Sequence, residues 1–259
     1  MLKIDNTRKK YNELITAIKK NGFTTYTILD YYNAVKNKDV ANKFCIMRHD
    51  VDGNVENALK MALLENFLGI RATYYFRMKG NLFNADIIAK IAELGHEVGY
   101  HYEHLPDANG NIQKATEIFK SNLSKLRNIA KVNTACMHGR PFSKYDSRDF
   151  WKYYKLEDFD LVAEPYINID YSDIYYFSDT GLSWNNTKFN IRDKVVSDKY
   201  YVVESTNELM ELFKNKKIDK VALLTHTDNW VDEPLVWLYY NSLNTCVNYA
   251  KRFLKLVVN

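Results

Sequence analysis

The sequence predicts an α/β fold in a single domain, with a mostly parallel sheet curled into a closed or nearly closed β/α barrel. From residue 44 onward, short apolar strand-like runs alternate with amphipathic helical segments in roughly seven or eight units. No linker rich in Pro, Gly or Ser separates these units. The chain has 259 residues, 46% of them hydrophobic, which is enough for one sizeable core.

The expected elements follow from the spacing of apolar residues. Helices at 5–20 and 28–35 precede the first strand, so residues 1–43 are expected to form an N-terminal helical extension and residues 44–259 the barrel. The expected strands are 44–48, 72–76, 97–102, 134–137, 161–163, 174–177, 200–203 and 221–224. The expected later helices are 55–67, 85–94, 113–130, 148–154, 207–213 and 234–254. Residues 170–193 are polar and Tyr-rich, and we expect an inserted β-hairpin over the cleft.

Composition excludes several classes of function. The net charge is only +4, and no dense Lys/Arg block is interleaved with aromatic residues, so nucleic acid is not an expected partner. The three cysteines include no C-x-x-C pair. We see no signal-peptide core and no apolar run long enough for a transmembrane segment. These features predict a reduced, cytoplasmic protein.

The segment from Phe44 to Asp52 is the centre of the functional prediction. Its apolar first half is typical of a buried parallel strand, and its second half is polar. Ligands of α/β folds bind at the carboxyl ends of such strands. Asp50 and Asp52 are therefore the first candidates for chemistry.

A second polar cluster follows the expected strand at 97–102. His101 and His104 end this strand with Glu103 between them, and histidines so placed can reach one divalent ion. Asp52 would complete a set of two histidines and one carboxylate with a position open for water. Alternatively, His104 is only a loop residue and Glu103 pairs with a lysine. Whether His104 or Glu103 is the third ligand stays open.

Two further strand ends carry candidates. His226 ends the strand at 221–224, where it is either a general acid or a core histidine bonded to a carbonyl. Arg140 would orient a catalytic carboxylate, bind an anionic substrate group or form an ordinary ion pair. Asp179 lies beside a glycine turn and would hold Arg140 or, with Trp184, line a sugar site. The candidates for substrate binding are Asp179, Trp184 and His138.

Taken together, these segments resemble the polysaccharide deacetylase (NodB-homology) family. Arg48-His-Asp-Val-Asp-Gly53 stands where the family has Thr-Phe-Asp-Asp-Gly, Gly95-His-Glu-Val-Gly99 matches its second strand, and Leu224-Thr-His226 matches its closing motif. Arg140-Pro141 is similar to its arginine–proline motif, and 179–184 to its aspartate- and tryptophan-bearing motif. The chain departs from the pattern because Val51 separates the two acids. It also departs because two residues, rather than three, separate His101 and His104.

The resemblance implies a distorted β/α barrel of seven strands and a metal-dependent carbohydrate deacetylase of a divergent RHDVD-type branch. It implies that Asp50 is the catalytic base, paired with Arg140, and that His226 is the general acid. The roles of Asp50 and Asp52 could be exchanged. The implied metal ligands are Asp52, His101 and His104.

The implied cofactor is zinc, with cobalt, nickel, manganese or iron as alternatives. The implied reaction releases acetate from an N-acetylated amino sugar in surface polysaccharide biosynthesis. The substrate would be an oligosaccharide, a lipid-linked or a nucleotide-linked sugar.

Two other functions remain open, and one motif is rejected. Asp50-Val-Asp52 is a D-x-D that could hold a metal–nucleotide sugar in a glycosyltransferase, although histidines at the strand ends argue against it. A non-catalytic metal- or carbohydrate-binding protein of the same fold is the other alternative. A calcium loop starting at Asp50 is rejected because its sixth and twelfth positions are Val55 and Met61.

Overall fold

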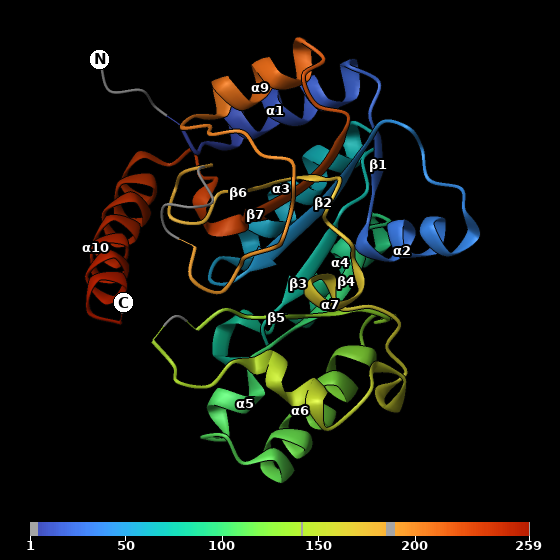
Figure 1. Cartoon of the computed structure of the whole chain (residues 1–259), viewed down its shortest axis with the longest axis vertical. Helices are drawn as coiled ribbons and strands as arrows, with labels where there is room; N and C mark the ends of the chain where they lie inside the picture. The colour runs from blue at the N-terminus through green and yellow to red at the C-terminus, as the bar shows by residue number, and fades with distance from the viewer. Residues whose placement is uncertain (1–4, 141, 185–189, 259) are drawn as a thin grey trace.

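A curled sheet lies at the centre of the molecule, with helices around it (Figure 1). The structure is a computed structural model that describes residues 5–140, 142–184 and 190–258. Among these residues the sheet has seven strands, and every strand pair is parallel. The α/β class and the distorted barrel predicted from the sequence are therefore confirmed.

The central strand of the sheet is β2, which is buried along all eight residues. The strands run in the order β5-β4-β3-β2-β7-β6, and β1 pairs with the first half of β2, Thr24 opposite Phe44. Their bounds are β1 (Thr24–Tyr26), β2 (Phe44–Val51), β3 (Thr73–Phe76), β4 (Glu97–Tyr102), β5 (Ala135–Met137), β6 (Tyr175–Ser178) and β7 (Lys220–His226).

The helices surround the sheet in chain order. The longer ones are α1 (Arg8–Lys20), α2 (Ile28–Asn37), α3 (Val55–Phe67), α4 (Ala85–Glu93), α6 (Ile112–Arg127), α9 (Thr206–Lys214) and α10 (Pro234–Val258). The short ones are α5 (His104–Asp107), α7 (Pro165–Asn168) and the 3₁₀ turns η1 (Gly80–Leu82), η2 (Ser147–Lys152), η3 (Leu156–Phe159) and η4 (Thr227–Asn229). Helix α3 begins where the Asn54 side chain accepts a hydrogen bond from the Asn57 amide at 2.9 Å. It ends just before Gly69, whose φ of +66° suits a C-terminal stop.

The structure differs from the expected elements in four places. Strand β1 lies inside the segment expected to be purely helical. Residues 161–163 form only an isolated bridge, Thr134 with Ala163, and residues 200–203 are irregular. The expected hairpin at 170–193 is instead the parallel strand β6 followed by irregular chain, and its residues 185–189 lie outside the described residues.

A buried polar cluster ties the N-terminal helix to the sheet. The Glu65 carboxylate of α3 accepts hydrogen bonds from the hydroxyls of Tyr11 on α1 and Tyr74 on β3. The same carboxylate lies 2.7 Å from Nε2 of His49 on β2. Because side chains alternate along a strand, Arg48 and Asp50 are on the opposite face of β2 from His49. Helix α1 packs beside α9 (Figure 1).

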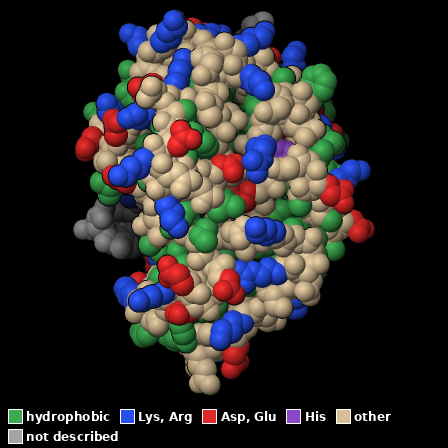
Figure 2. Space-filling view, turned by 90° about the vertical axis from the view of Figure 1, so that its right-hand side faces the viewer, with side chains coloured by type: hydrophobic (Ala, Val, Ile, Leu, Met, Phe, Trp, Pro, Cys, Tyr) green, Lys and Arg blue, Asp and Glu red, His purple; other side chains and the backbone are tan. Residues whose placement is uncertain are grey.

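The outer surface carries charges of both signs. On the face drawn in Figure 2, Lys and Arg side chains are scattered among Asp and Glu side chains. No helix in the described part of the chain is long and apolar enough to cross a membrane.

Candidate active site

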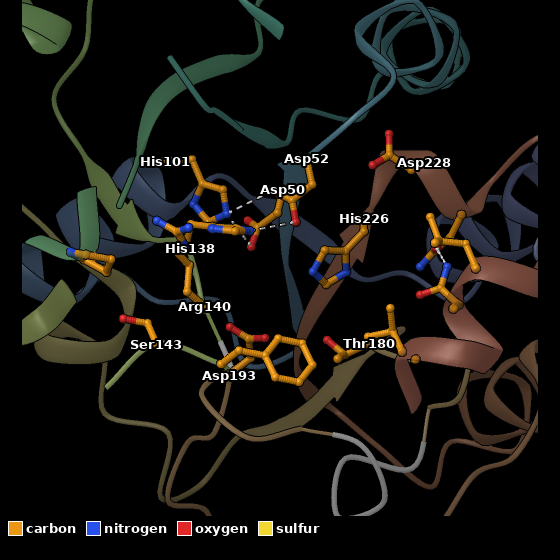
Figure 3. A pocket seen from close by; sticks show the side chains of 18 of the residues that line it. Asp50, Asp52, His101, His138, Arg140, Ser143, Thr180, Asp193, His226 and Asp228 are labelled. Atoms are coloured by element: carbon orange, nitrogen blue, oxygen red, sulfur yellow. Dashed lines mark hydrogen bonds and ion pairs between the residues drawn. The ribbon is translucent and has the colours of Figure 1, made fainter. Parts of the chain in front are cut away.

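A cavity of about 720 Å³ opens at the carboxyl ends of the strands (Figure 3). The residues that line it include Asp50 and Asp52 at the end of β2, His101 of β4, His138 just after β5 and His226 at the end of β7. One wall comes from helix α10. Parallel strands present their carboxyl ends at one edge, which is why residues far apart in sequence meet here.

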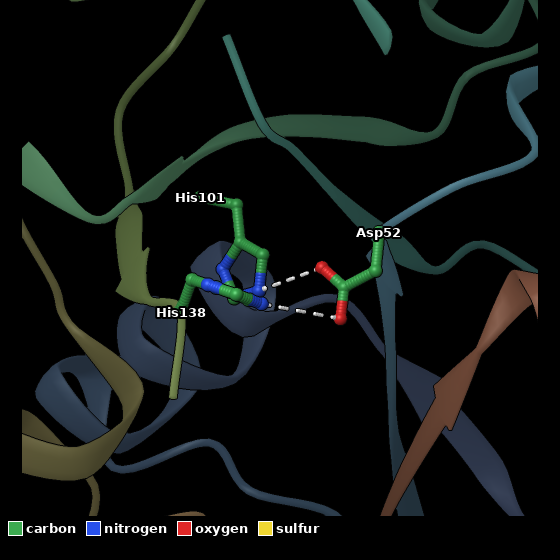
Figure 4. Close-up of side chains that lie close together, drawn as sticks. All are labelled: Asp52, His101 and His138. Carbon is green, nitrogen blue, oxygen red and sulfur yellow. Dashed lines mark ion pairs between the residues drawn. The ribbon is translucent and has the colours of Figure 1, made fainter. Parts of the chain in front are cut away.

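Three of these side chains form a compact cluster (Figure 4). Nε2 of His101 lies 3.4 Å from Oδ1 of Asp52, and Nε2 of His138 lies 3.6 Å from Oδ2 of Asp52. One ligand atom from each residue falls within 4.8 Å of those of the other two. Two imidazoles and one carboxylate are a donor set that divalent transition metals accept.

The other ring nitrogens determine which atoms face the centre of the cluster. Nδ1 of His101 lies 3.0 Å from the carbonyl oxygen of Cys136, and Nδ1 of His138 lies 3.2 Å from Oε2 of Glu103. Both partners can only accept, so in a neutral imidazole Nδ1 carries the proton. The lone pair is then on Nε2, toward Asp52, as in metal-bound histidines.

The cluster fits a divalent ion. A tetrahedral site with bonds of about 2.1 Å has edges of roughly 3.4 Å, and the ligand atoms, all within 4.8 Å of one another, need to draw together only slightly to reach it. Oδ1 of Asp52 is buried and receives no hydrogen bond of good geometry from any described residue, although Nε2 of His101 lies at ion-pair distance, 3.4 Å. A cation at the cluster would satisfy this oxygen. Burial would raise the pKa of Asp52, but the charges of His138 and His101 lower it well below its usual range. Asp52 is therefore an anionic ligand candidate.

His104 lies away from this cluster, which corrects the expected ligand set. It is the first residue of α5, and its ring packs 4.8 Å from Phe119 and 4.3 Å from Phe150, centroid to centroid. Neither ring nitrogen has a hydrogen-bond partner among the described residues. Burial lowers the pKa of His104 to about 3, so the ring is neutral. His138, expected to bind substrate, stands in the place expected for His104.

Asp50 is held by an arginine of its own strand. Nε and Nη2 of Arg48 donate to the two Asp50 oxygens at 2.9 and 2.7 Å. Burial would raise the pKa of Asp50, but the charges of Arg48 and His101 lower it below its usual value. Oδ2 of Asp50 lies 3.4 Å from Nε2 of His101, so this ionised carboxylate borders the Asp52–His101–His138 cluster.

Arg140 does not pair with Asp50, contrary to the expectation from the resemblance. Its Nη1 donates to Oδ1 of Asp107 at 2.7 Å, and its Nε lies 3.7 Å from Oε2 of Glu103. Arg140 still lines the cavity, at the rim. Arg48 was not predicted as the partner of Asp50, although the two residues are two positions apart on one strand and so share a face.

His226 faces the cluster from the other side of the cavity (Figure 3). Its Nδ1 lies 2.7 Å from Oδ1 of Asp179, which also accepts from Trp230 Nε1 at 2.8 Å through its other oxygen. Burial would lower the pKa of His226, but the charge and hydrogen bond of Asp179 raise it to about 10. The ring is therefore protonated at neutral pH. Asp179 orients this histidine and does not hold Arg140.

Trp184 does not line the cavity, so the expected substrate contact is corrected. Its side chain is 2% exposed, and its Nε1 donates to Oγ1 of Thr206 at 3.0 Å. Its ring lies 5.9 Å from that of Trp230, which places Trp184 in the core behind Asp179.

Several cavity residues carried no signal in the sequence. They come from loops, from the turn η4 and from α10, and they include Phe142, Tyr145, Asp193, Asp228, Tyr240 and Leu243. Among them Asp228 packs over the turn after β2, where a Cβ on Gly53 would lie 2.6 Å from its carboxylate. Burial raises the pKa of Asp228 to about 7. Whether such residues line the cavity depends on how the loops fold over the sheet, and the periodicity of the strands carries no information about that.

Comparison with known proteins gives likenesses of structure only. No protein-family model matches the sequence, and no curated protein matches it. Solved structures with similarity include a family 4 carbohydrate esterase from Bacillus anthracis (13% identity, TM-score 0.42, 82% of this chain and 88% of that one). A peptidoglycan deacetylase, PdaC, from Bacillus subtilis has 11% identity and a TM-score of 0.38, over 83% and 96% of the two chains. A mutant of a CE4 family pseudoenzyme has 12% identity and a TM-score of 0.41, over 82% and 68%. Likenesses of this degree carry no conclusion about activity, so the chemistry rests on the chain's own side chains.

Proposed function

We propose that this protein is a metal-dependent hydrolase that removes an N-acetyl or similar acyl group from an amino sugar. One arrangement supports the proposal above all. The Asp52–His101–His138 cluster adjoins an ionised carboxylate, Asp50, and faces a protonated imidazole, His226, across the same cavity. Amide hydrolysis needs a base for water and an acid for the departing amine, and these two groups supply both.

The metal would be held by Asp52, His101 and His138. Zinc is the first candidate for this donor set, with cobalt, nickel, manganese or iron as alternatives. A divalent ion bound there lowers the pKa of a water molecule and polarises an amide carbonyl. Because Arg48 pairs with both oxygens of Asp50, we assign Asp52 of the D-x-D pair to the metal. The two histidines that complete this donor set argue against a glycosyltransferase.

Asp50 is the proposed general base. Its position beside His101 and its lowered pKa make it an available proton acceptor at neutral pH. It takes a proton from water as the water oxygen forms a bond with the acyl carbon. Arg48 fixes both carboxylate oxygens, so the base is held in one orientation during this transfer.

His226 is the proposed general acid. It gives its proton to the amide nitrogen as the C–N bond breaks, which turns a poor leaving group into a neutral amine. Asp179 holds the ring through Nδ1, so the proton transferred is the one on Nε2. The products are a carboxylate, acetate for an N-acetyl substrate, and a free amino sugar.

The cavity suits a substrate larger than one sugar. Its volume of about 720 Å³ is in the upper part of the range for ligand pockets. The rings of Phe142, Tyr145 and Tyr240 line it, and aromatic faces pack well against sugar rings. We therefore include oligosaccharide, lipid-linked and nucleotide-linked amino sugars as substrate classes, with a role in surface polysaccharide biosynthesis implied by the motif resemblance.

The test is acetate release from a panel of N-acetylated amino sugars by metal-loaded, chelator-stripped and reloaded protein. We expect activity in the first and third samples only, and we expect His138→Ala to bind metal much more weakly, through Asp52 and His101 alone, and to lose activity. His104→Ala is the matched histidine control and should keep its metal. Activity in fully stripped protein would overturn the proposal. Metal binding without hydrolysis of any panel member would favour the non-catalytic binding protein.

A further inference from the structure

Glu103 sits directly behind His138 and is 4% exposed. Its two oxygens have different partners. Oε1 accepts a hydrogen bond from Nε of Arg77 at 2.8 Å and pairs with Nη2 of the same guanidinium at 2.7 Å. It also forms an ion pair with Nζ of Lys79 at 3.2 Å. Oε2 lies 3.2 Å from Nδ1 of His138. Oε1 is thus anchored by two cations, whereas Oε2 faces the imidazole and has Nε of Arg140 farther away, at 3.7 Å.

Arg77 also contacts Asp52, a second candidate ligand. Nη1 of Arg77 donates to the main-chain oxygen of Asp52 at 3.2 Å. Arg77 therefore bridges the carboxylate behind His138 and the backbone that carries Asp52. The positions of these two side chains are coupled through one guanidinium group.

A carboxylate on Nδ1 of a histidine has a known physical effect on metal binding. It fixes the tautomer with the lone pair on Nε2, holds the ring plane, and raises the basicity of the ligand nitrogen. Loss of such a partner typically weakens metal affinity about 10- to 100-fold.

We propose that Glu103 is a positioning residue that sets the metal affinity of the site through His138. This rests on the proposed function in one respect, the assignment of His138 as a ligand. Glu103 is itself no ligand here, because its carboxylate is turned to the Nδ1 side of the ring, away from Asp52.

Asp107 provides a matched control. Its carboxylate pairs with Lys79 at 2.8 Å and Arg140 at 2.7 Å, two cations that also lie near Glu103. No ion pair or hydrogen bond joins it to His138 in the described part of the chain. Asp107→Asn therefore makes the same change of charge in the same cluster without touching the ligand.

The experiment measures zinc and cobalt affinity of the full chain by competition with a chromophoric chelator. Glu103→Gln and Glu103→Asp should both bind about 10- to 100-fold more weakly than the unaltered protein. Glu103→Asp keeps the charge but shortens the reach, and it carries the test if Glu103→Gln does not fold. Asp107→Asn should stay within about threefold. Equal weakening in Asp107→Asn, or unchanged affinity in both Glu103 variants, would overturn the proposal.

A double-mutant cycle tests whether Glu103 acts through His138. In a His138→Ala background, Glu103→Gln should cause no further loss of affinity, because the ring that it positions is gone. A full additional loss would overturn the positioning role. If the unaltered protein binds neither metal, the metal centre of the proposed function fails as well. Unchanged affinity in the Glu103 variants overturns only the inference about Glu103.

Discussion

Replacing Asp179 by asparagine should move the alkaline limb of the pH–kcat profile, where kcat falls with rising pH, to lower pH. Asp179 lies 2.7 Å from Nδ1 of His226. Although burial opposes the charged ring, the charge and hydrogen bond of Asp179 raise the pKa of His226 to about 10. An acid works only while protonated, so activity falls as pH rises through this pKa.

The size of the shift follows from the two pKa values. The ordinary value for histidine is 6.5, so a complete return to it would move the limb by about 3.5 pH units, or about 5 kcal/mol. The charges of Asp52 and Asp50 also raise the pKa of His226 and remain in the variant. We therefore expect a shift of about one to three units.

The assay is kcat for acetate release between about pH 6 and 11, together with the NMR titration of the His226 ring. Asp193→Asn is the matched control, because Asp193 lines the same cavity but accepts from the Tyr166 hydroxyl at 3.2 Å. It should leave the limb in place. A folded Asp179→Asn protein whose kcat is lowered equally at every pH would refute the role of His226 as the acid.

Three further changes test other parts of the structure. His104→Phe should leave metal stoichiometry unchanged and should not lower the melting temperature, because the ring is already surrounded by aromatic side chains; loss of metal would contradict its placement. Arg48→Met should lower kcat far more than it changes KM, and urea unfolding should show a loss of about 3–5 kcal/mol, because Asp50 is left buried without its partner; an unchanged kcat would contradict this. Tyr11→Phe removes a hydrogen bond to Glu65 and should cost about 1–3 kcal/mol in the same unfolding experiment, with activity unaltered; unchanged stability would mean that the bond does not hold α1.

The pair of His226 and Asp179 should also make stability depend on pH. Because the pKa of His226 is raised in the folded protein, its contribution is fully present below pH 6.5 and is lost as pH rises to about 10. Thermal unfolding across this window should show the loss in the unaltered protein and a smaller one in His226→Gln. An equal slope in both proteins would assign the pH dependence to other groups.

The sequence predicted the fold where local signals agree with the global structure. Helix α3 was expected at 55–67 from its apolar spacing and from Gly69 after its last turn, and it has those bounds. The structure adds the capping side chain of Asn54 at its start. Strand β1 was missed because three residues carry little periodicity and their partner, β2, is distant in sequence. The run at 200–203 has strand-forming residues but no partner strand in the described sheet, so its β-propensity did not make it a strand.

For the candidate site, the sequence predicted which strand ends come together. Asp50, Asp52, His101 and His226 line one cavity, as the rule on carboxyl ends of parallel strands suggests. The rule does not give side-chain direction. His104 follows its strand but opens α5 and turns into an aromatic cluster that assembles from distant segments.

The central claim is that Asp52, His101 and His138 hold one divalent ion. A crystal structure of the zinc-soaked protein with anomalous data at the zinc edge tests it most directly. We expect a single strong peak about 2.0–2.2 Å from a carboxylate oxygen of Asp52 and from Nε2 of both histidines. A peak bound by other residues, or none at this cluster in zinc-saturated protein, would contradict it.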